Sequence, residues 1–157
     1  MRDLKKRTLG KKKASEDGMR GVTEYLNLNT EGDGTLVDIT AQLHKILSKT
    51  KMKNGTLAVF VVGSTAAITT FEYEPGMIKD IRDLWEKLVP SGQRYAHDDT
   101  WGDANGFSHL RAALQGSSLV IPFADNNLIL GTWQQVVLAE FDNRPRERRI
   151  VLQFMGK

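Results

Sequence analysis

The chain has 157 residues, of which 40% are hydrophobic and 26% are charged. This balance excludes an intrinsically disordered chain, and the length fits one domain with a single core. The absence of cysteine excludes disulfides, thiolate metal ligands and a thiol nucleophile. No apolar run approaches the roughly eighteen residues of a membrane helix, and no apolar signal segment follows the basic N-terminus. We therefore expect a cytoplasmic location and no membrane partner.

The positive charge is concentrated at the start of the chain. Residues 1–13 hold seven lysines or arginines and one acid, so the rest keeps fifteen of the 22 bases and eighteen of the 19 acids, a net charge of −3. Such an arm either binds nucleic acid through phosphates or is a solvated extension that aids solubility or packs on a neighbouring subunit. Because it has no aromatic residue to stack on bases, we favour the extension over a nucleic-acid partner. We assign residues 1–18 to this basic extension and 19–157 to a single domain.

The first half of the domain contains four predicted strands and two predicted helices. The predicted strands cover residues 22–28, 36–39, 56–62 and 65–73. The predicted helices cover 41–50, with Thr40 as N-cap, and 77–88. Because residues 56–62 (TLAVFVV) are continuously apolar, we expect this strand to be buried on both faces.

The second half begins with a polar segment, residues 91–104, which we predict to be a long loop, and loops of this length are usually either functional or disordered. Asn105 is predicted to cap a helix that ends near Leu114. Strands are predicted at 119–123, 128–130, 134–141 and 148–154. Since strands cluster late and helices cluster in the middle, the order indicates an α+β fold with a largely antiparallel or mixed sheet and helices packed on it.

Two of the three histidines lie in or next to the polar segment. His97 and His109 are surrounded there by acids, and histidine with carboxylate serves either acid–base chemistry or metal binding. The alternative is a solvated acidic loop with two incidental histidines. Asp98 and Asp99 offer oxygen ligands for Mg²⁺ carrying a diphosphate, or are simply an exposed acidic pair. His44, in the predicted helix 41–50, is interpreted as a structural or surface residue.

Other polar positions offer anion contacts. Gly63, Ser64 and Thr65 interrupt a β-prone run and present N–H groups and hydroxyls that suit a phosphate, but no P-loop lysine follows them. Glu72 faces a cavity or pairs with a basic residue. Four arginines surround the last predicted turn, where they either clamp an anion or form a solvated sheet edge: Arg144, Arg146, Arg148 and Arg149.

Two segments carry a resemblance to a known family. They are Asn105-Gly106-Phe107-Ser108-His109-Leu110 and Gly131-Thr132-Trp133-Gln134, supported by Tyr95-Ala96-His97, Ser64-Thr65 and Glu140-Phe141-Asp142. Together they resemble the YjbQ family, also called the secondary thiamine-phosphate synthase family, over roughly residues 19–157. The resemblance implies an α+β domain that forms a homotrimer with polar pockets near subunit boundaries. It also implies a thiamine-phosphate synthase activity, found in some members, that joins hydroxymethylpyrimidine diphosphate to thiazole phosphate.

The resemblance assigns a role to each candidate residue. The catalytic residues would be His97, His109 and Glu72, with the two histidines also the ligands of a divalent metal, Mg²⁺ or Zn²⁺. Contacts to the small phosphorylated substrate would come from Ser64, Thr65, Asn105, Ser108, Thr132, Trp133, Gln134 and Arg146. The family has His-Thr-Thr where this chain has Gly63-Ser64-Thr65, and often Asn-Glu at Phe71-Glu72. The lost histidine motivates the alternative of a non-catalytic trimer that keeps a vestigial small-molecule or metal-binding pocket.

Overall fold

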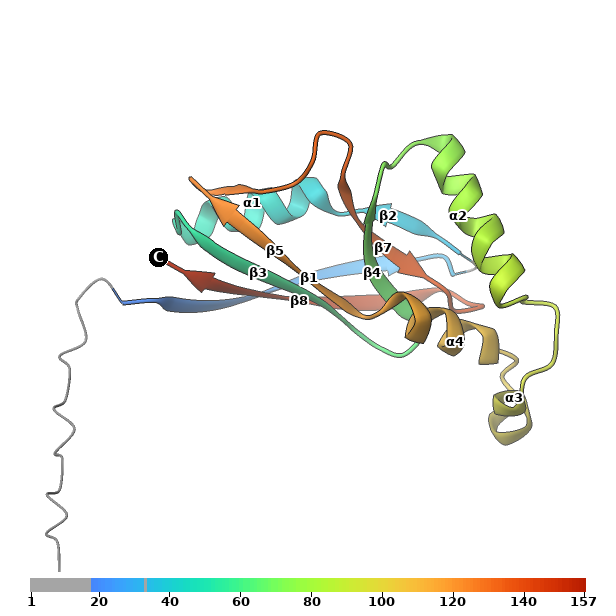
Figure 1. Ribbon diagram of the computed structural model, residues 1–157. Helices are drawn as coiled ribbons and strands as arrows, with labels where there is room; N and C mark the ends of the chain where they lie inside the picture. Colours follow the sequence, from blue (N-terminus) through green and yellow to red (C-terminus); the bar gives the residue numbers. More distant parts are fainter. Residues whose placement is uncertain (1–17, 33) are drawn as a thin grey trace, which may run out of the picture.

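The computed structural model describes residues 18–32 and 34–157 and contains eight strands and four helices (Figure 1). The basic leader, residues 1–13, lies outside the described residues, as does Asp33 of the first predicted turn. The strands are β1 (Arg20–Thr30), β2 (Leu36–Asp38), β3 (Gly55–Val62), β4 (Ala66–Phe71), β5 (Ser118–Ala124), β6 (Asn127–Leu128), β7 (Gln135–Glu140) and β8 (Arg146–Gly156). The helices are α1 (Thr40–Thr50), α2 (Pro75–Leu88), α3 (Ala96–Trp101) and α4 (Gly106–Gln115).

The strands form two antiparallel sheets. The larger sheet has the order β1-β8-β3-β5-β6, and the smaller one has the order β2-β7-β4. Every strand pair in them is antiparallel. The α+β prediction with a largely antiparallel sheet is therefore confirmed.

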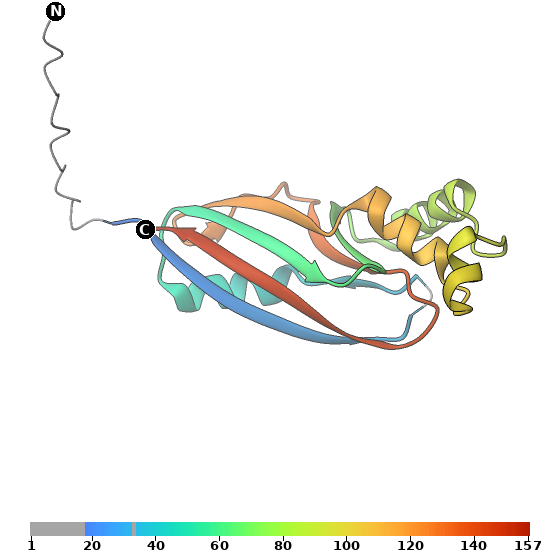
Figure 2. The same ribbon diagram turned by 90° about the horizontal axis from the view of Figure 1, so that it is seen from below.

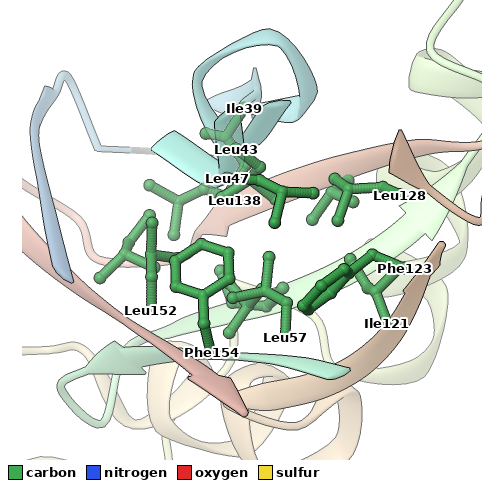
Figure 3. Packing of buried hydrophobic residues seen from close by; sticks show 14 of the residues in the cluster. Ile39, Leu43, Leu47, Leu57, Ile121, Phe123, Leu128, Leu138, Leu152 and Phe154 are labelled. Carbon is green, nitrogen blue, oxygen red and sulfur yellow. The ribbon is translucent and has the colours of Figure 1, made fainter. Parts of the chain in front are cut away.

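The main hydrophobic core lies between the larger sheet and a layer made of α1 and the smaller sheet (Figure 3). Leu43 and Leu47 of α1 point from one side toward Leu57 and Phe154 of the larger sheet, and all four side chains are buried. Strand alternation places every second residue of β3 and β8 in this core.

A second core covers the other face of the smaller sheet. Ala67, Val137 and Ala139 point into it, whereas their neighbours along β4 and β7 point into the main core. Trp85 of α2 packs edge-on against Phe141 with ring centroids 4.6 Å apart. The smaller sheet is thus a middle layer that is buried on both faces, and β7 is buried from Val136 through Glu140.

The prediction that residues 56–62 are buried on both faces is wrong. In β3 only Leu57, Val59 and Val61 are buried, whereas Phe60 and Val62 keep 44% and 49% of their surface exposed. The run is continuously apolar because the outer face of the larger sheet is itself apolar. Figure 2 looks toward this face, and none of the described helices lies over it.

One of the two predicted helix starts is corrected, and the other is confirmed in position. Thr40 is the first residue of α1 rather than its N-cap. Its hydroxyl does not cap the helix, because it donates to Asp38 and accepts from the Val136 N–H. Asn105 does occupy the N-cap position of α4, but its side chain makes no capping hydrogen bond in the described structure.

The predicted loop 91–104 contains the short helix α3. Its polar, largely exposed residues give no apolar periodicity, so the pattern that marks other helices is missing here. Asp98 makes it possible, because one carboxylate oxygen accepts from the Tyr95 N–H and the other from the Gly106 N–H. These hydrogen bonds lower the pKa of Asp98 and join the starts of α3 and α4. Among the described helices, none is long and apolar enough to cross a membrane.

Candidate functional site

A hollow of about 450 Å³ lies between the turn that joins β3 to β4 and the outer side of α4. It is lined by Gly63, Ser64, Ala66, His109, Ala112, Ala113, Gly116 and Ser117. Small residues make up most of the wall, and His109 is the only one of these eight side chains that carries a titratable group. The size is that of a pocket for a small molecule.

Gly63 is required at its place in this turn. Its φ of 145° lies in a region that residues with a β-carbon rarely adopt, and a β-carbon there would stand 2.8 Å from Arg148 Nη1. The glycine therefore lets the buried guanidinium approach the backbone of the hollow's rim.

His97 of α3 and His109 of α4 form a pair beside the hollow. Their ring centroids are 4.4 Å apart and the rings are tilted by 51°. His97 Nε2 lies 3.9 Å from Asp103 Oδ1, which is too long for a hydrogen bond. The two histidines predicted from the sequence are thus brought together, with one carboxylate next to them.

The pKa of His109 is lowered from its ordinary value of 6.5. Burial is the main cause, His97 adds to it, and the carboxylates of Asp103 and Asp142 oppose it. His109 is therefore neutral near pH 7, and a neutral imidazole offers one N–H donor and one lone pair to a ligand in the hollow.

A buried network of charges holds the rim of this site. Arg148 forms a bidentate pair with Glu140, with Nε–Oε2 and Nη2–Oε1 distances of 2.6 and 2.5 Å. The Arg148 Nη2 group also donates to the hydroxyl of Thr65, which in turn donates to Asp142. Arg146 completes the network through Nε, which donates to Asp142 Oδ2 at 2.8 Å. The hydroxyl of Thr65, predicted to hold phosphate, is thus engaged within the protein.

Asp142 is charged despite its complete burial. Burial alone would raise its pKa, but hydrogen bonds from Arg146 and Thr65 and the charge of Arg148 outweigh burial, and the pKa is lowered. Only its Oδ2 atom takes part in these bonds.

Three buried polar atoms near the start of α4 have no hydrogen-bond partner within residues 18–32 and 34–157. They are Asn105 Oδ1, Ser108 Oγ and Asp142 Oδ1. Buried polar atoms of folded proteins are nearly always partnered, so such a group marks a place for a water molecule or a ligand. Asn105 and Ser108 are two of the predicted substrate contacts, and they lie on the same turn as His109.

The histidine pair offers two of the ligands that a metal ion would need. In the part of the chain that the structure describes, no three His, Asp or Glu side chains are grouped as metal ligands. His97 and His109 supply two nitrogen donors, whereas structural and catalytic zinc sites take three or four protein ligands.

The remaining predicted residues lie elsewhere on the chain. Gln134 Nε2 donates to Thr70 Oγ1 near the far end of β4, and Trp133 beside it is 70% exposed. Glu72 is exposed just beyond the same end, and Ser64 precedes the near end. Along an extended strand the separation from Ser64 to Thr70 is about 20 Å. On one chain, therefore, the Gly131–Gln134 turn and Glu72 do not reach the histidine pair.

Sequence reasoning missed the ionic network. The arginine-rich turn was interpreted as a clamp or a solvated edge, but Arg148 is only 6% exposed. One signal points to it: Glu140 continues a strand of apolar residues, and a charge in such a run needs a buried partner.

The fold and the site define an α+β domain with two stacked antiparallel sheets and a small-molecule hollow beside a histidine pair. Family comparison agrees, because residues 24–157 match the family described as "UPF0047 protein YjbQ-like". The chain belongs to this family. A UPF0047 protein of Archaeoglobus fulgidus is 38% identical over 128 residues, covering 82% of this chain and 97% of that relative. One of Methanothermobacter thermautotrophicus is 39% identical over 139 residues, covering 88% and 95%.

Solved structures show the same fold. A YbjQ-like protein of unknown function from Sulfolobus solfataricus has a TM-score of 0.79 and 31% identity, covering 88% of this chain and 100% of that one. A hypothetical protein from Aeropyrum pernix has a TM-score of 0.76 and 32% identity, covering 85% and 99%. The resemblance recognised in the sequence is thereby confirmed at the level of family and fold.

Proposed function

We propose that the hollow beside His109 binds a small phosphorylated molecule and that the chain is a transferase of the thiamine-phosphate synthase type. One observation carries the proposal: a neutral, half-buried imidazole lines a hollow of suitable size, next to unpartnered buried polar atoms. Ser64 and Ser117 add hydroxyl groups to the wall. Arg146 lies close enough for its charge to lower the pKa of His109, so a cation stands near the same site.

In the proposed reaction the bond between the pyrimidine methylene carbon and the diphosphate oxygen breaks, and the electron pair leaves with the diphosphate. The lone pair of the thiazole nitrogen then forms the new carbon–nitrogen bond. The protein has to position the two rings and stabilise the charge on the leaving oxygen. The N–H of His109, the imidazole of His97 and the positive charge of Arg146 are suited to that charge.

A direct assay tests this proposal. The full chain is incubated with hydroxymethylpyrimidine diphosphate, thiazole phosphate and Mg²⁺, and thiamine phosphate is measured after oxidation to its fluorescent thiochrome. We expect product from the wild type and from a His44→Ala control, whose histidine lies in α1. A wild-type rate no higher than that of the His97→Ala, His109→Ala double variant would overturn it.

We further propose that the chain forms a homotrimer through the outer face of the larger sheet. Tyr25 and Phe60 stand opposite Val151 in register, and Ala58 stands opposite Val120. Large apolar side chains on this face keep much of their surface exposed: Tyr25, Phe60, Val62, Val120 and Met155. An apolar face of this kind favours association with another protein surface. A monomer in sedimentation at micromolar concentration would contradict the trimer.

A cytoplasmic location stays a prediction.

The separation of the two predicted halves of the site supports an arrangement between copies. If Trp133 acts with His109, Trp133 must come from a neighbouring chain, because the two lie at opposite ends of β4. In a cyclic trimer, each site would then take His109 from one chain and Trp133 from the next. In an equal mixture of inactive His109→Ala and inactive Trp133→Ala chains, one site in four has both residues intact, so about a quarter of the wild-type activity should return. Absence of any recovery would restrict the site to residues of one chain.

The second candidate function is a trimer that binds a small molecule without turnover. The glycine at position 63, where the family has a histidine, favours it, because His109 is the one imidazole among the eight residues that line the hollow. A thermal-shift screen with thiamine precursors, inorganic phosphate and divalent metals distinguishes the two candidates. Stabilisation by a precursor that is lost in His109→Ala, without product in the assay above, would establish binding alone.

A further inference from the structure

The turn between α3 and α4 is strained. Gly102 has a φ of 70° and Ala104 a φ of 51°, so Asp103 stands between two residues in the left-handed region. Glycine adopts this region freely, but the β-carbon of alanine makes it unfavourable. A strained residue of this kind persists only where the surrounding structure holds it, and such residues cluster at functional sites.

Asn143, in the turn between β7 and β8, holds this strained segment. Its side-chain Nδ2 donates to the carbonyl oxygen of Asp103 at 2.9 Å and to that of Ala104 at 3.3 Å. The neighbouring residue Asp142 belongs to the buried ionic network. The turn that carries Asp103 is thereby tied to the same rigid strand ends that hold the hollow.

Asp103 is the carboxylate that this arrangement presents to the histidine pair. Its Oδ1 atom lies 3.9 Å from His97 Nε2, and 33% of the His97 side chain and 37% of the Asp103 side chain are exposed. The two acids of α3 are engaged elsewhere: Asp98 accepts from two backbone N–H groups, and Asp99 pairs with Arg94. The order of groups is then Asp103, His97, His109 and the hollow.

We propose that Asp103 is the positioning residue of His97, and that the strained turn at residues 102–104 exists to place its carboxylate. The carboxylate draws the Nε2 edge of His97 toward itself and so fixes the ring that lies against His109. In catalytic triads an acid orients an imidazole without touching the substrate, and Asp103 would do the same across a longer contact. The catalytic part of this inference rests on the proposed function, whereas the placement of the ring does not.

The experiment uses the imidazole nitrogen resonances of the full chain. With three histidines in the sequence, each ring is assigned from a single-histidine variant. We expect Asp103→Asn to change the ¹⁵N shifts of His97 and leave those of His44 unchanged, and Asp103→Glu to return them part of the way. Asp99→Asn is the matched control, because it removes an acid of the same helix that pairs with Arg94 and should leave His97 unchanged. His97 shifts in Asp103→Asn equal to those of the wild type would overturn the proposal.

Two further variants separate this inference from the proposed function. Asn143→Ala releases the turn, and we expect it to move the His97 resonances in the same direction as Asp103→Asn. In the product assay, Asp103→Asn should lower kcat by about ten- to a hundredfold while KM stays within about twofold, as expected for a misplaced catalytic group. A wild type without activity refutes the proposed function and leaves the resonance test intact. A changed KM with unchanged kcat contradicts the positioning role.

Discussion

Arg148→Met is the sharpest test of how the site is held together. In the wild type, Glu140 is fully buried and the Arg148 side chain is 7% exposed, so both charges are compensated inside the protein. Methionine retains much of the side-chain volume but removes the cation. Glu140 then keeps only Thr30 and the Asp142 N–H as donors. Breaking a buried pair in this way costs about 3–5 kcal/mol, because one charge stays buried without its partner.

The loss should be visible in two measurements. For a domain of this size, about 3–5 kcal/mol corresponds to a fall in Tm of roughly 10–15 °C. Urea unfolding at one fixed protein concentration should show a lower midpoint with an unchanged m-value. Arg144→Met is the matched control, because Arg144 is exposed in the turn before β8, and we expect it to stay within about 0.5 kcal/mol of wild type.

The double variant Glu140→Leu, Arg148→Met separates the lost pair from the stranded charge. If the isolated carboxylate causes the damage, removing it as well should recover most of the stability, since apolar replacements of buried pairs are often neutral. A free energy of unfolding for Arg148→Met within about 1 kcal/mol of the wild-type value would refute the reasoning. A double variant no more stable than the single one would refute the role of the stranded charge.

Three more predictions follow from the described contacts. Burial lowers the pKa of His109 below 6.5, so the unfolded chain binds a proton more readily than the folded one, and stability should fall as the pH drops from about 7.5 to 5.5. In thermal melts, His109→Asn should flatten this pH dependence, whereas His44→Asn should leave it unchanged. Asp98→Ala removes the acceptor of two backbone N–H groups, so hydrogen exchange at Tyr95 and Gly106 should accelerate. Phe60→Glu places a charge on the apolar outer face and should shift the sedimentation profile toward the monomer.

Each of these predictions has a contradicting result. Equal pH dependence in His109→Asn and wild type would show that another group controls acid stability. Unchanged exchange at Tyr95 and Gly106 would show that Asp98 does not hold the two helix starts. An unchanged sedimentation profile for Phe60→Glu would place the interface elsewhere.

Most of the fold could be predicted from local patterns. The strands β1, β5 and β8 and the helix α2 follow from regular spacing of apolar residues, because each has a defined buried side. The helix α3 could not be found in this way, since its residues make few buried apolar contacts and hydrogen bonds of Asp98 fix its start. The apolar run in β3 led to a wrong prediction of burial on both faces. Local composition does not show whether the outer face of a strand is covered by another part of the same chain.

The candidate site was predictable in its residue types and less so in its arrangement. His97 and His109 stand together as the sequence indicated. Whether Trp133 lies near the histidine pair depends on which end of β4 its turn reaches. The pairing of strands that are distant in the sequence decides which end this is. The ionic network was missed because its members come from three separate segments: Thr65, Glu140 with Asp142, and Arg146 with Arg148.

The middle strand β7 and the helix α3 differ in how much of the core a substitution would disturb. Four consecutive residues, Val136 to Ala139, supply both cores and lead into Glu140, so a substitution on this side of the site also alters the stability of the whole domain. By contrast, α3 contributes no fully buried side chain, and it still carries His97. Substitutions at the exposed positions of α3 should therefore cost little stability, whereas a substitution among the buried residues of β7 disturbs one of the two cores.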